Sequence, residues 1–333
     1  MKLHGSVFGD LAGVPERARR AEADGYDGVV SAEISNDPFL PLALAAEHTE
    51  HIELVTAIAV AFSRNPMTLA QLGHDLNAYS KGRFVLGLGS QIKPHITKRF
   101  SMPWSKPAAR MREFVLAMRA IWNTWHTGAP LEFRGEFYSH TLMTPMFVPA
   151  NVEYGAPRVV VAAVGNLMTE AAGEVADGLL AHAFTTPRYL REVTLPALER
   201  GLAKAGRKRE DIEVICPAFV ASGETDEAFE ASRNALRQQI AFYASTPAYR
   251  PVLELHGWEF GPELTALSKQ GKWVEMGQRI DDEVLETFAV VAAPEDVGAE
   301  LARRYAGALD TWIATFQPAN PDTRAALFAA LRA

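Results

Sequence analysis

The chain has 333 residues, of which 48% are apolar and 22% charged, and its formal net charge is −7. This composition predicts a folded protein with a large core and argues against disorder and against a general binder of nucleic acid or anionic membranes. Cys216 is the single cysteine, which excludes an internal disulfide and a cysteine-based metal cluster. The start lacks a signal-peptide pattern and no apolar run approaches the roughly 20 residues that span a bilayer, so we expect a soluble, cytoplasmic protein.

Short apolar runs alternate with longer segments of helical periodicity along the whole chain. The predicted strands cover residues 2–8, 28–33, 54–60, 84–89, 158–164, 178–184, 212–222 and 311–316. The predicted helices cover residues 14–24, 38–49, 66–79, 110–126, 167–176, 187–205 and 226–244. Eight apolar strands that alternate with helices favour an α/β fold of the (β/α)8 TIM-barrel type. A doubly wound open sheet is the competing architecture.

Two stretches interrupt this alternation, near residues 131–157 and 247–286. The first contains LEFRGEFYSH, whose Arg134-Gly135 centre predicts a hairpin, and the second is expected to be helical around residues 263–279. We therefore expect one domain, residues 1–333, with two insertions that form a lid. Aromatic side chains in or beside the insertions indicate either a mostly apolar substrate or ordinary lid core: Phe137, Tyr138, Phe242, Tyr243, Trp258 and Trp273.

The candidate site residues directly follow the predicted strands, because active sites of such barrels lie at the carboxyl ends of the strands. After the fourth strand, Ser90 and Gln91 can hydrogen-bond a ligand, and Gly87 and Gly89 allow its close approach. Residues 93–112 then hold six basic side chains and no acidic one. This segregation predicts an anionic partner, unless acidic neighbours elsewhere in the fold pair with the segment.

The fifth strand ends at Gly165 and Asn166, where a helix begins. The free N–H groups of a helix N-terminus bind phosphate, so this turn is a candidate phosphate site. Asn166 is alternatively a simple helix cap.

Proton-transfer candidates are few. Glu33 ends the second strand among apolar neighbours, where a carboxylate needs a partner or a site, and it could hydrogen-bond a cofactor or act as an acid or base. His95 and His182 are the other candidates, whereas His4 reads as a core or rim histidine. The sequence has neither a metal-ligand spacing nor a GxSxG nucleophile motif, so we expect no metal site and no nucleophilic catalysis.

Several motifs in order and spacing resemble the luciferase-like monooxygenase superfamily, and within it the F420-dependent oxidoreductase branch. They are Asn65-Pro66, SKGRF at 80–84, GLGSQ at 87–91, YGAP at 154–157, AAVG at 162–165 and AGEVADG at 172–178. The resemblance covers almost the whole chain. It implies coenzyme F420 as the cofactor, with FMN as the alternative.

The resemblance also implies where the cofactor binds. A non-prolyl cis peptide, at Thr56-Ala57 or Ala57-Ile58, would form a bulge against the ring, and Glu33 would lie near the ring's polar edge. The phosphate and ribityl groups would bind at the ends of strands five and six, which match Ala162, Val164, Gly165, Asn166, Leu180 and His182. Glu33 and His95 remain the candidate catalytic residues.

At two positions this sequence differs from the pattern of the family, and both differences limit the reactions that we expect. Sugar-phosphate dehydrogenases of the branch carry a catalytic histidine where Ile34 stands and a phosphate-binding lysine where Thr185 stands, so glucose-6-phosphate oxidation is not expected. The sequence predicts hydride transfer between the deazaflavin and an unidentified, mostly apolar small molecule. The alternatives are an FMN-dependent monooxygenase and a non-catalytic flavin-binding barrel. A homodimer is expected from the family alone.

Overall fold

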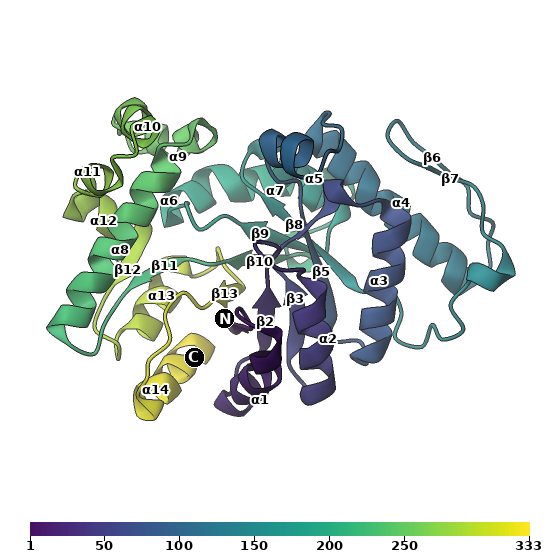
Figure 1. The fold of residues 1–333 in the computed structure, drawn as a ribbon, viewed down its shortest axis with the longest axis horizontal. Helices are drawn as coiled ribbons and strands as arrows, with labels where there is room; N and C mark the ends of the chain where they lie inside the picture. The colour runs from purple at the N-terminus through teal and green to yellow at the C-terminus, as the bar shows by residue number, and fades with distance from the viewer. The chain divides into compact units, whose positions relative to one another are not determined.

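A computed structural model describes residues 1–333, and its central element is one parallel sheet (Figure 1). The eight strands that form the ring are β1 (Lys2–Ser6), β2 (Gly28–Ser31), β3 (Glu53–Thr56), β5 (Phe84–Gly89), β8 (Arg158–Ala163), β9 (Gly178–Ala181), β10 (Glu213–Cys216) and β13 (Thr311–Ile313). Their order is β3-β2-β1-β13-β10-β9-β8-β5, and β3 also pairs with β5, so the sheet closes. The predicted (β/α)8 barrel is confirmed, and the open sheet is excluded.

Helices follow the strands. Those before residue 245 lie at nearly the predicted positions, whereas the last two of the helices given next were not predicted. They are α1 (Val14–Asp24), α2 (Phe39–His48), α3 (Pro66–Tyr79), α4 (Pro107–Thr127), α5 (Asn166–Val175), α6 (Pro187–Tyr189), α7 (Leu195–Lys204), α8 (Asp226–Ala244), α13 (Val297–Tyr305) and α14 (Pro321–Arg332). Side-chain caps set several starts: Asn65 Oδ1 accepts the Thr68 N–H, and the Thr225 hydroxyl accepts the Ala228 N–H. No helix is both long and apolar enough to cross a membrane.

Four predicted elements are divided in the structure. The strand predicted at 54–60 consists of β3 and β4 (Ala59–Val60), and a π-helical turn, Leu190–Thr194, separates α6 from α7 in the helix predicted at 187–205. The strand predicted at 212–222 stops at Pro217, which has no N–H to donate, and resumes as β11 (Phe219–Ala221). β11 pairs with β12 (Ala289–Val291), a strand that the sequence analysis missed. The helix predicted at 263–279 breaks at Gly271, whose φ is +69°, into α10 (Gly261–Lys269) and α11 (Trp273–Gly277). The second insertion also carries α9 (Arg250–Leu255) and α12 (Asp282–Phe288).

The hairpin predicted in the first insertion is confirmed. β6 (Phe133–Arg134) pairs antiparallel with β7 (Ser139–His140). The Glu113 carboxylate of α4 accepts three main-chain N–H groups of its turn, at residues 136–138, at 2.6–2.8 Å. The connector that follows, up to residue 157, forms no strand and packs on α3. There the Asn77 side-chain amide donates to the carbonyl oxygens of Tyr154 and Gly155.

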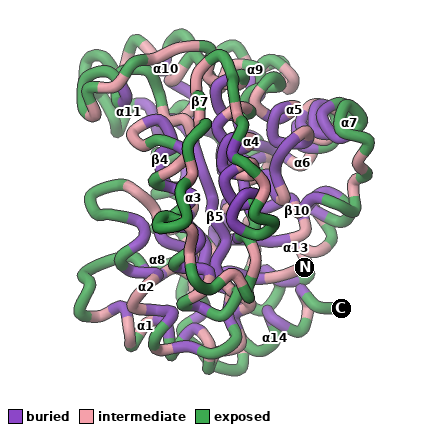
Figure 2. Tube along the Cα trace, turned by 90° about the vertical axis from the view of Figure 1, so that its right-hand side faces the viewer, coloured by how far each residue is buried: buried purple, intermediate pink, exposed green.

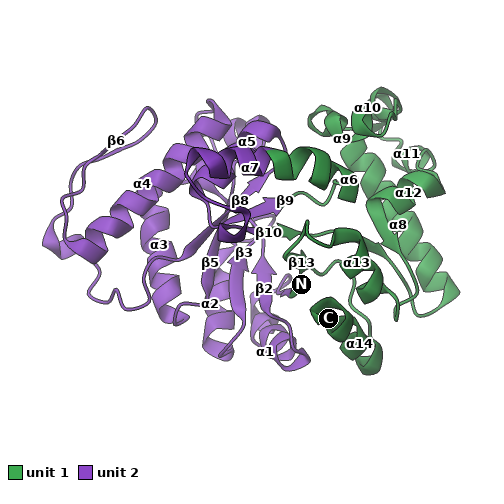
Figure 3. Ribbon diagram, turned by 180° about the vertical axis from the view of Figure 1, so that it is seen from behind, with its two compact units in different colours: residues 1–3, 181–196, 214–333 green, residues 4–180, 197–213 purple.

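The chain divides into two compact units (Figure 3). Unit 1 comprises residues 1–3, 181–196 and 214–333, and unit 2 comprises residues 4–180 and 197–213. In unit 2, β5 is buried along its whole length (Figure 2). In unit 1, an apolar cluster centred on Phe184, Phe219 and Phe288 packs against α8 and α12. The single domain predicted for residues 1–333 stays a prediction.

Candidate active site

The main feature of unit 2 is the bulge that follows β3. The peptide bond between Ala57 and Ile58 is cis, which confirms the second of the two predicted positions. The Ala57 N–H donates to the Ser31 carbonyl oxygen at 2.7 Å, and the Glu33 N–H donates to the Ile58 carbonyl oxygen at 3.1 Å. Main-chain hydrogen bonds from the end of β2 therefore fix the bulge on one side.

Two glycines of β5 make room for the bulge on the other side. A Cβ atom on Gly87 would overlap the Thr56 carbonyl oxygen, and one on Gly89 would lie 2.7 Å from Ile58 Cδ1. The buried Thr56 hydroxyl donates to the Gly87 carbonyl oxygen and accepts the Gly87 N–H, both at 2.8 Å. Gly87 thus admits the main chain of Thr56 and Gly89 admits the side chain of Ile58, while the predicted ligand contact of Thr56 stays a prediction.

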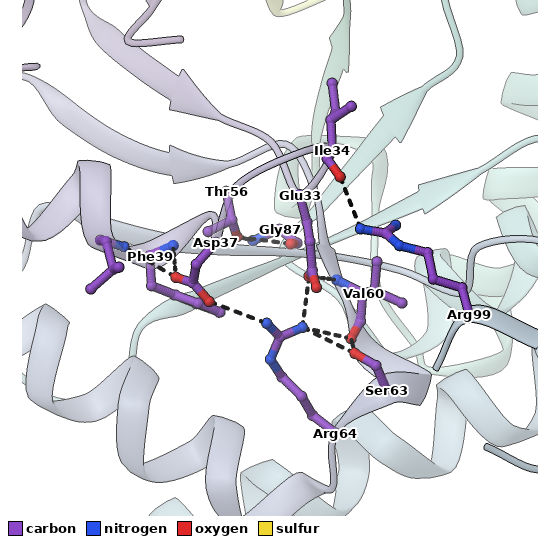
Figure 4. Close-up of polar contacts among 11 residues, drawn as sticks. Glu33, Ile34, Asp37, Phe39, Thr56, Val60, Ser63, Arg64, Gly87 and Arg99 are labelled. Carbon is purple, nitrogen blue, oxygen red and sulfur yellow. Dashed lines mark hydrogen bonds and ion pairs between the residues drawn. The ribbon is translucent and has the colours of Figure 1, made fainter. Parts of the chain in front are cut away.

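An ion pair completes the support (Figure 4). Glu33 Oε2 accepts a hydrogen bond from Arg64 Nη1 at 2.6 Å and one from the Val60 N–H at 2.7 Å. Arg64 also donates to the Val60 carbonyl oxygen and the Ser63 hydroxyl, both at 3.1 Å, and lies 3.4 Å from Asp37. The Glu33 side chain is only 8% exposed. We call Glu33, Arg64 and the Val60 N–H the brace, because they tie the end of β2 to the segment after the bulge.

The brace bears on the role of Glu33. One oxygen, Oε2, is saturated by charge-assisted and main-chain hydrogen bonds, while Oε1 has no partner within the protein. A carboxylate held in this way is suited to accept a hydrogen bond from a ligand N–H.

Apolar side chains are exposed after four barrel strands. Phe8 follows β1, Ile34 follows β2, Ile92 follows β5, and Val164 follows β8. Ile34 is 70% exposed, and Leu167 in the first turn of α5 is 73% exposed. Large apolar groups exposed at the ends of neighbouring strands indicate a surface for an apolar or planar ligand.

The N-terminus of α5 has no side-chain cap. Gly165 is the cap residue, so Asn166 is the first helical residue and the alternative that Asn166 caps the helix is wrong. Asn166 is exposed, and a Cβ atom on Gly165 would meet nothing within 4 Å. The Met168 N–H donates to the Gly165 carbonyl oxygen at 3.1 Å, whereas the N–H groups of Asn166 and Leu167 belong to exposed residues, so the turn remains a candidate phosphate site.

Other predicted residues of unit 2 lie along the ends of β5, β8 and β9. Ser90 and Gln91 are half-buried, the Ser90 hydroxyl donates to the Gln91 carbonyl oxygen at 3.1 Å, and Gln91 has a φ of +55°. Ala162 and Leu180 are also half-buried, and no contact in the structure tests their predicted role.

His95 begins a π-helical turn, His95–Arg99, and its side chain is exposed. Arg99 of the same turn donates to the Ile34 carbonyl oxygen at 2.9 Å. This bond brings the turn that carries His95 next to the end of β2 and hence to the brace. The prediction that His95 transfers a proton stays open to experiment.

Half of the basic side chains in the segment at 93–112 have acidic or aromatic partners within unit 2. Lys106 pairs with Glu136 at 2.7 Å, and Arg112 pairs with Glu174 at 2.5 Å. Arg110 is buried, stacks on Phe62 and donates to the Tyr138 hydroxyl at 2.8 Å. Pairing with acidic and aromatic neighbours therefore explains half of the segment, and Lys93 and Lys98 remain exposed without a partner.

In unit 1, His182 follows β9 within an aromatic group. Its Nδ1 accepts the Phe184 N–H at 3.0 Å, and its Nε2 lies 3.1 Å from the Tyr249 hydroxyl. Its ring stacks on Tyr249 and meets Tyr243 edge-on, each at 4.7 Å between centroids. Burial lowers the pKa of His182 to about 4, so it is neutral at pH 7.

The sequence analysis missed two residues, Arg64 and Tyr249. Arg64 directly precedes the Asn65-Pro66 motif, and the need of a buried Glu33 for a partner was the signal that could have found it. Tyr249 lies in an insertion without periodicity, and no sequence signal marks it. No group of three or more His, Cys, Asp or Glu side chains converges on a metal site. His4 is fully buried, with Nε2 3.4 Å from Glu53.

The fold is a closed (β/α)8 barrel with a supported cis bulge and exposed apolar groups at its strand ends, which together form a candidate ligand site. The family model described as luciferase-like monooxygenase matches residues 2–311 of the chain. The chain therefore belongs to the luciferase-like monooxygenase family.

Three relatives illustrate its place in that family. The chain is 55% identical over 323 residues to Uncharacterized protein Rv1360 of Mycobacterium tuberculosis, covering 97% of this chain and 95% of that protein. It is 27% identical over 313 residues to the 5,10-methylenetetrahydromethanopterin reductase of Archaeoglobus fulgidus, covering 91% and 89%. Its fold matches the coenzyme F420 dependent tetrahydromethanopterin reductase from Methanopyrus kandleri with a TM-score of 0.77 and 20% identity, over 98% and 95% of the two chains.

Proposed function

We propose that the protein is a coenzyme F420-dependent oxidoreductase that acts on an uncharged, mostly apolar organic substrate. The observation that carries the proposal is the bulge at Ala57-Ile58. Main-chain hydrogen bonds and the brace hold this bulge on the β2 side, and the glycines of β5 leave room for it on the other side. A fixed main-chain surface beside exposed apolar groups suits a planar tricyclic ring. The F420 dependence in the name of the Methanopyrus kandleri structure supports the same cofactor.

The residues present fit this cofactor. The main chain of Ala57 and Ile58 would support the ring, and Glu33 Oε1 would accept a hydrogen bond from its polar edge. The uncapped first turn of α5, at Gly165 and Asn166, would bind the phosphate. When bound, the deazaflavin supplies the hydride chemistry, and the protein orients the reactants and excludes water.

Titration of the purified protein with F420 and with FMN, each followed by its absorbance and fluorescence, tests the proposal. We expect micromolar or tighter binding of F420 and much weaker binding of FMN. Tight binding of FMN and none of F420 would favour the FMN-dependent monooxygenase instead, a function that the family's name supports. Tight F420 binding without turnover of any donor or acceptor would favour the non-catalytic barrel. The expected homodimer stays a prediction that light scattering can test.

A further inference from the structure

The hydrogen bonds of His182 determine whether His182 or Tyr249 is the donor in the contact between them. Nδ1 accepts the Phe184 N–H, so this nitrogen carries a lone pair and the neutral ring holds its proton on Nε2. The Nε2–H group must then donate to the Tyr249 oxygen across the 3.1 Å contact. The hydroxyl proton of Tyr249 is left over, because no other acceptor in the protein lies within hydrogen-bonding distance of it.

The surroundings of Tyr249 are aromatic. The rings of His182, Phe184 and Tyr243 lie 4.7, 5.5 and 5.7 Å from its ring, between centroids. Tyr249 itself is half-buried. Burial and the neighbouring Tyr243 raise the pKa of Tyr249 to about 12, and burial lowers that of His182, with no cation contributing to either shift. The hydroxyl stays protonated at neutral pH, and the absence of a nearby cation disfavours a phosphate or carboxylate as the acceptor.

We propose that the Tyr249 hydroxyl donates a hydrogen bond to an uncharged acceptor oxygen, a carbonyl or alcohol oxygen, of the organic substrate, and that His182 is the positioning residue. The proposal rests on the proposed function only in taking this ligand as the redox substrate. His182 orients the phenol but does not relay a proton to it, because loss of the Nε2 proton would leave an imidazolate. The aromatic walls favour a substrate whose carbon skeleton is apolar.

The first experiment tests the orientation without any ligand. The full-length protein, labelled with 15N-histidine, is observed by long-range 1H–15N NMR between pH 6 and 8, and His182 is assigned by the loss of its signals in His182→Asn. We expect the neutral tautomer with the proton on Nε2 across this range. A proton on Nδ1 would overturn the proposal, because Tyr249 would then donate to Nε2 and have nothing left to offer a ligand.

The second experiment tests the acceptor with acetophenone, a carbonyl probe, and ethylbenzene, its match without oxygen. Losing one hydrogen bond should weaken acetophenone binding roughly ten-fold in Tyr249→Phe and leave ethylbenzene unchanged. Tyr79→Phe, which removes the hydroxyl of an exposed tyrosine on α3, should bind both probes as the wild type does. Equal binding of acetophenone to the wild type and Tyr249→Phe, or no binding to the wild type, would overturn the proposal.

The same variants separate this inference from the proposed function. Tyr249→Phe should bind F420 as tightly as the wild type does. Weaker F420 binding with unchanged acetophenone binding would assign the acceptor oxygen to the cofactor and overturn the substrate assignment. Failure of the wild type to bind F420, with the acetophenone difference intact, would sink the proposed function and leave the donor assignment standing.

Discussion

The brace makes a quantitative prediction for Arg64→Met. The substitution leaves the Glu33 carboxylate, 8% exposed, with the Val60 N–H as its single remaining donor. Removing one partner of a buried ion pair costs about 3–5 kcal/mol, and because Arg64 is 22% exposed we expect the lower end, about 3 kcal/mol. Glu33→Gln keeps an oxygen for the Val60 N–H and loses only the charge, so it should cost about 1–2 kcal/mol.

The assay is urea unfolding of the wild type, both single variants and the double variant, followed by F420 titration of each. The two substitutions share one interaction, so the double variant should be more stable than the sum of the single effects by about 1–2 kcal/mol. F420 affinity should fall in parallel with stability, because the brace supports the bulge. Arg19→Met, which removes an exposed arginine paired with Glu16 on α1, is the control and should change neither quantity.

Two results would refute this reasoning. Arg64→Met with a free energy of unfolding within roughly 0.5 kcal/mol of the wild type would show that the ion pair does not support the bulge. Glu33→Gln with unchanged stability and F420 affinity but abolished turnover would show that Glu33 is the proton-transfer group and not a brace.

Three further predictions concern single sites. Gly87→Ala should destabilise the protein by about 3 kcal/mol or more, because its Cβ atom would overlap the Thr56 carbonyl oxygen, whereas Gly165→Ala has open space and should unfold at nearly the wild-type urea concentration. Gly165→Asp should abolish F420 binding, measured by titration, while circular dichroism stays unchanged, since it places a carboxylate at the proposed phosphate turn. The pKa of His182 is about 4 in the folded protein and about 6.5 in the unfolded chain. Between these pH values only the unfolded chain binds a proton at His182, so the free energy of unfolding should fall as the pH drops from about 6.5 to about 4. Urea unfolding at a series of pH values should show a total loss of about 3 kcal/mol in the free energy of unfolding over this range. This loss should disappear in His182→Asn and persist in His51→Asn, a control at an exposed histidine.

The barrel could be predicted from the sequence because its strands are buried on both faces and so stand out as continuous apolar runs. All eight ring strands lie where such runs were found. One error comes from backbone chemistry inside such a run, because Pro217 ends β10 within a stretch that is mostly apolar on both sides of it. The three residues of β12 are too few to show a period.

Less of the candidate site than of the barrel could be predicted from the sequence, because its residues come together only through the fold. The cis bond at Ala57-Ile58 was predicted through family resemblance, since no residue type near it marks such a bond. Glu33 could be recognised as a buried carboxylate in need of a partner, but Arg64 lies 31 positions later and comes near it only through the fold. The alternative that Asn166 caps α5 was wrong by one position, because Gly165 adopts the extended conformation of a cap residue.

The brace also constrains which group can move a proton. Of the two predicted catalytic residues, Glu33 is bound through Oε2 to the Arg64 guanidinium. His95 has no side-chain partner and stands on a turn that the Arg99 bond tethers to the Ile34 carbonyl oxygen. We therefore predict that proton transfer falls to His95 or to water and that Glu33 orients a ligand N–H. Because His95 is exposed, a reaction through it requires bound substrate to displace the surrounding water, and His95→Gln should lower turnover without weakening F420 binding.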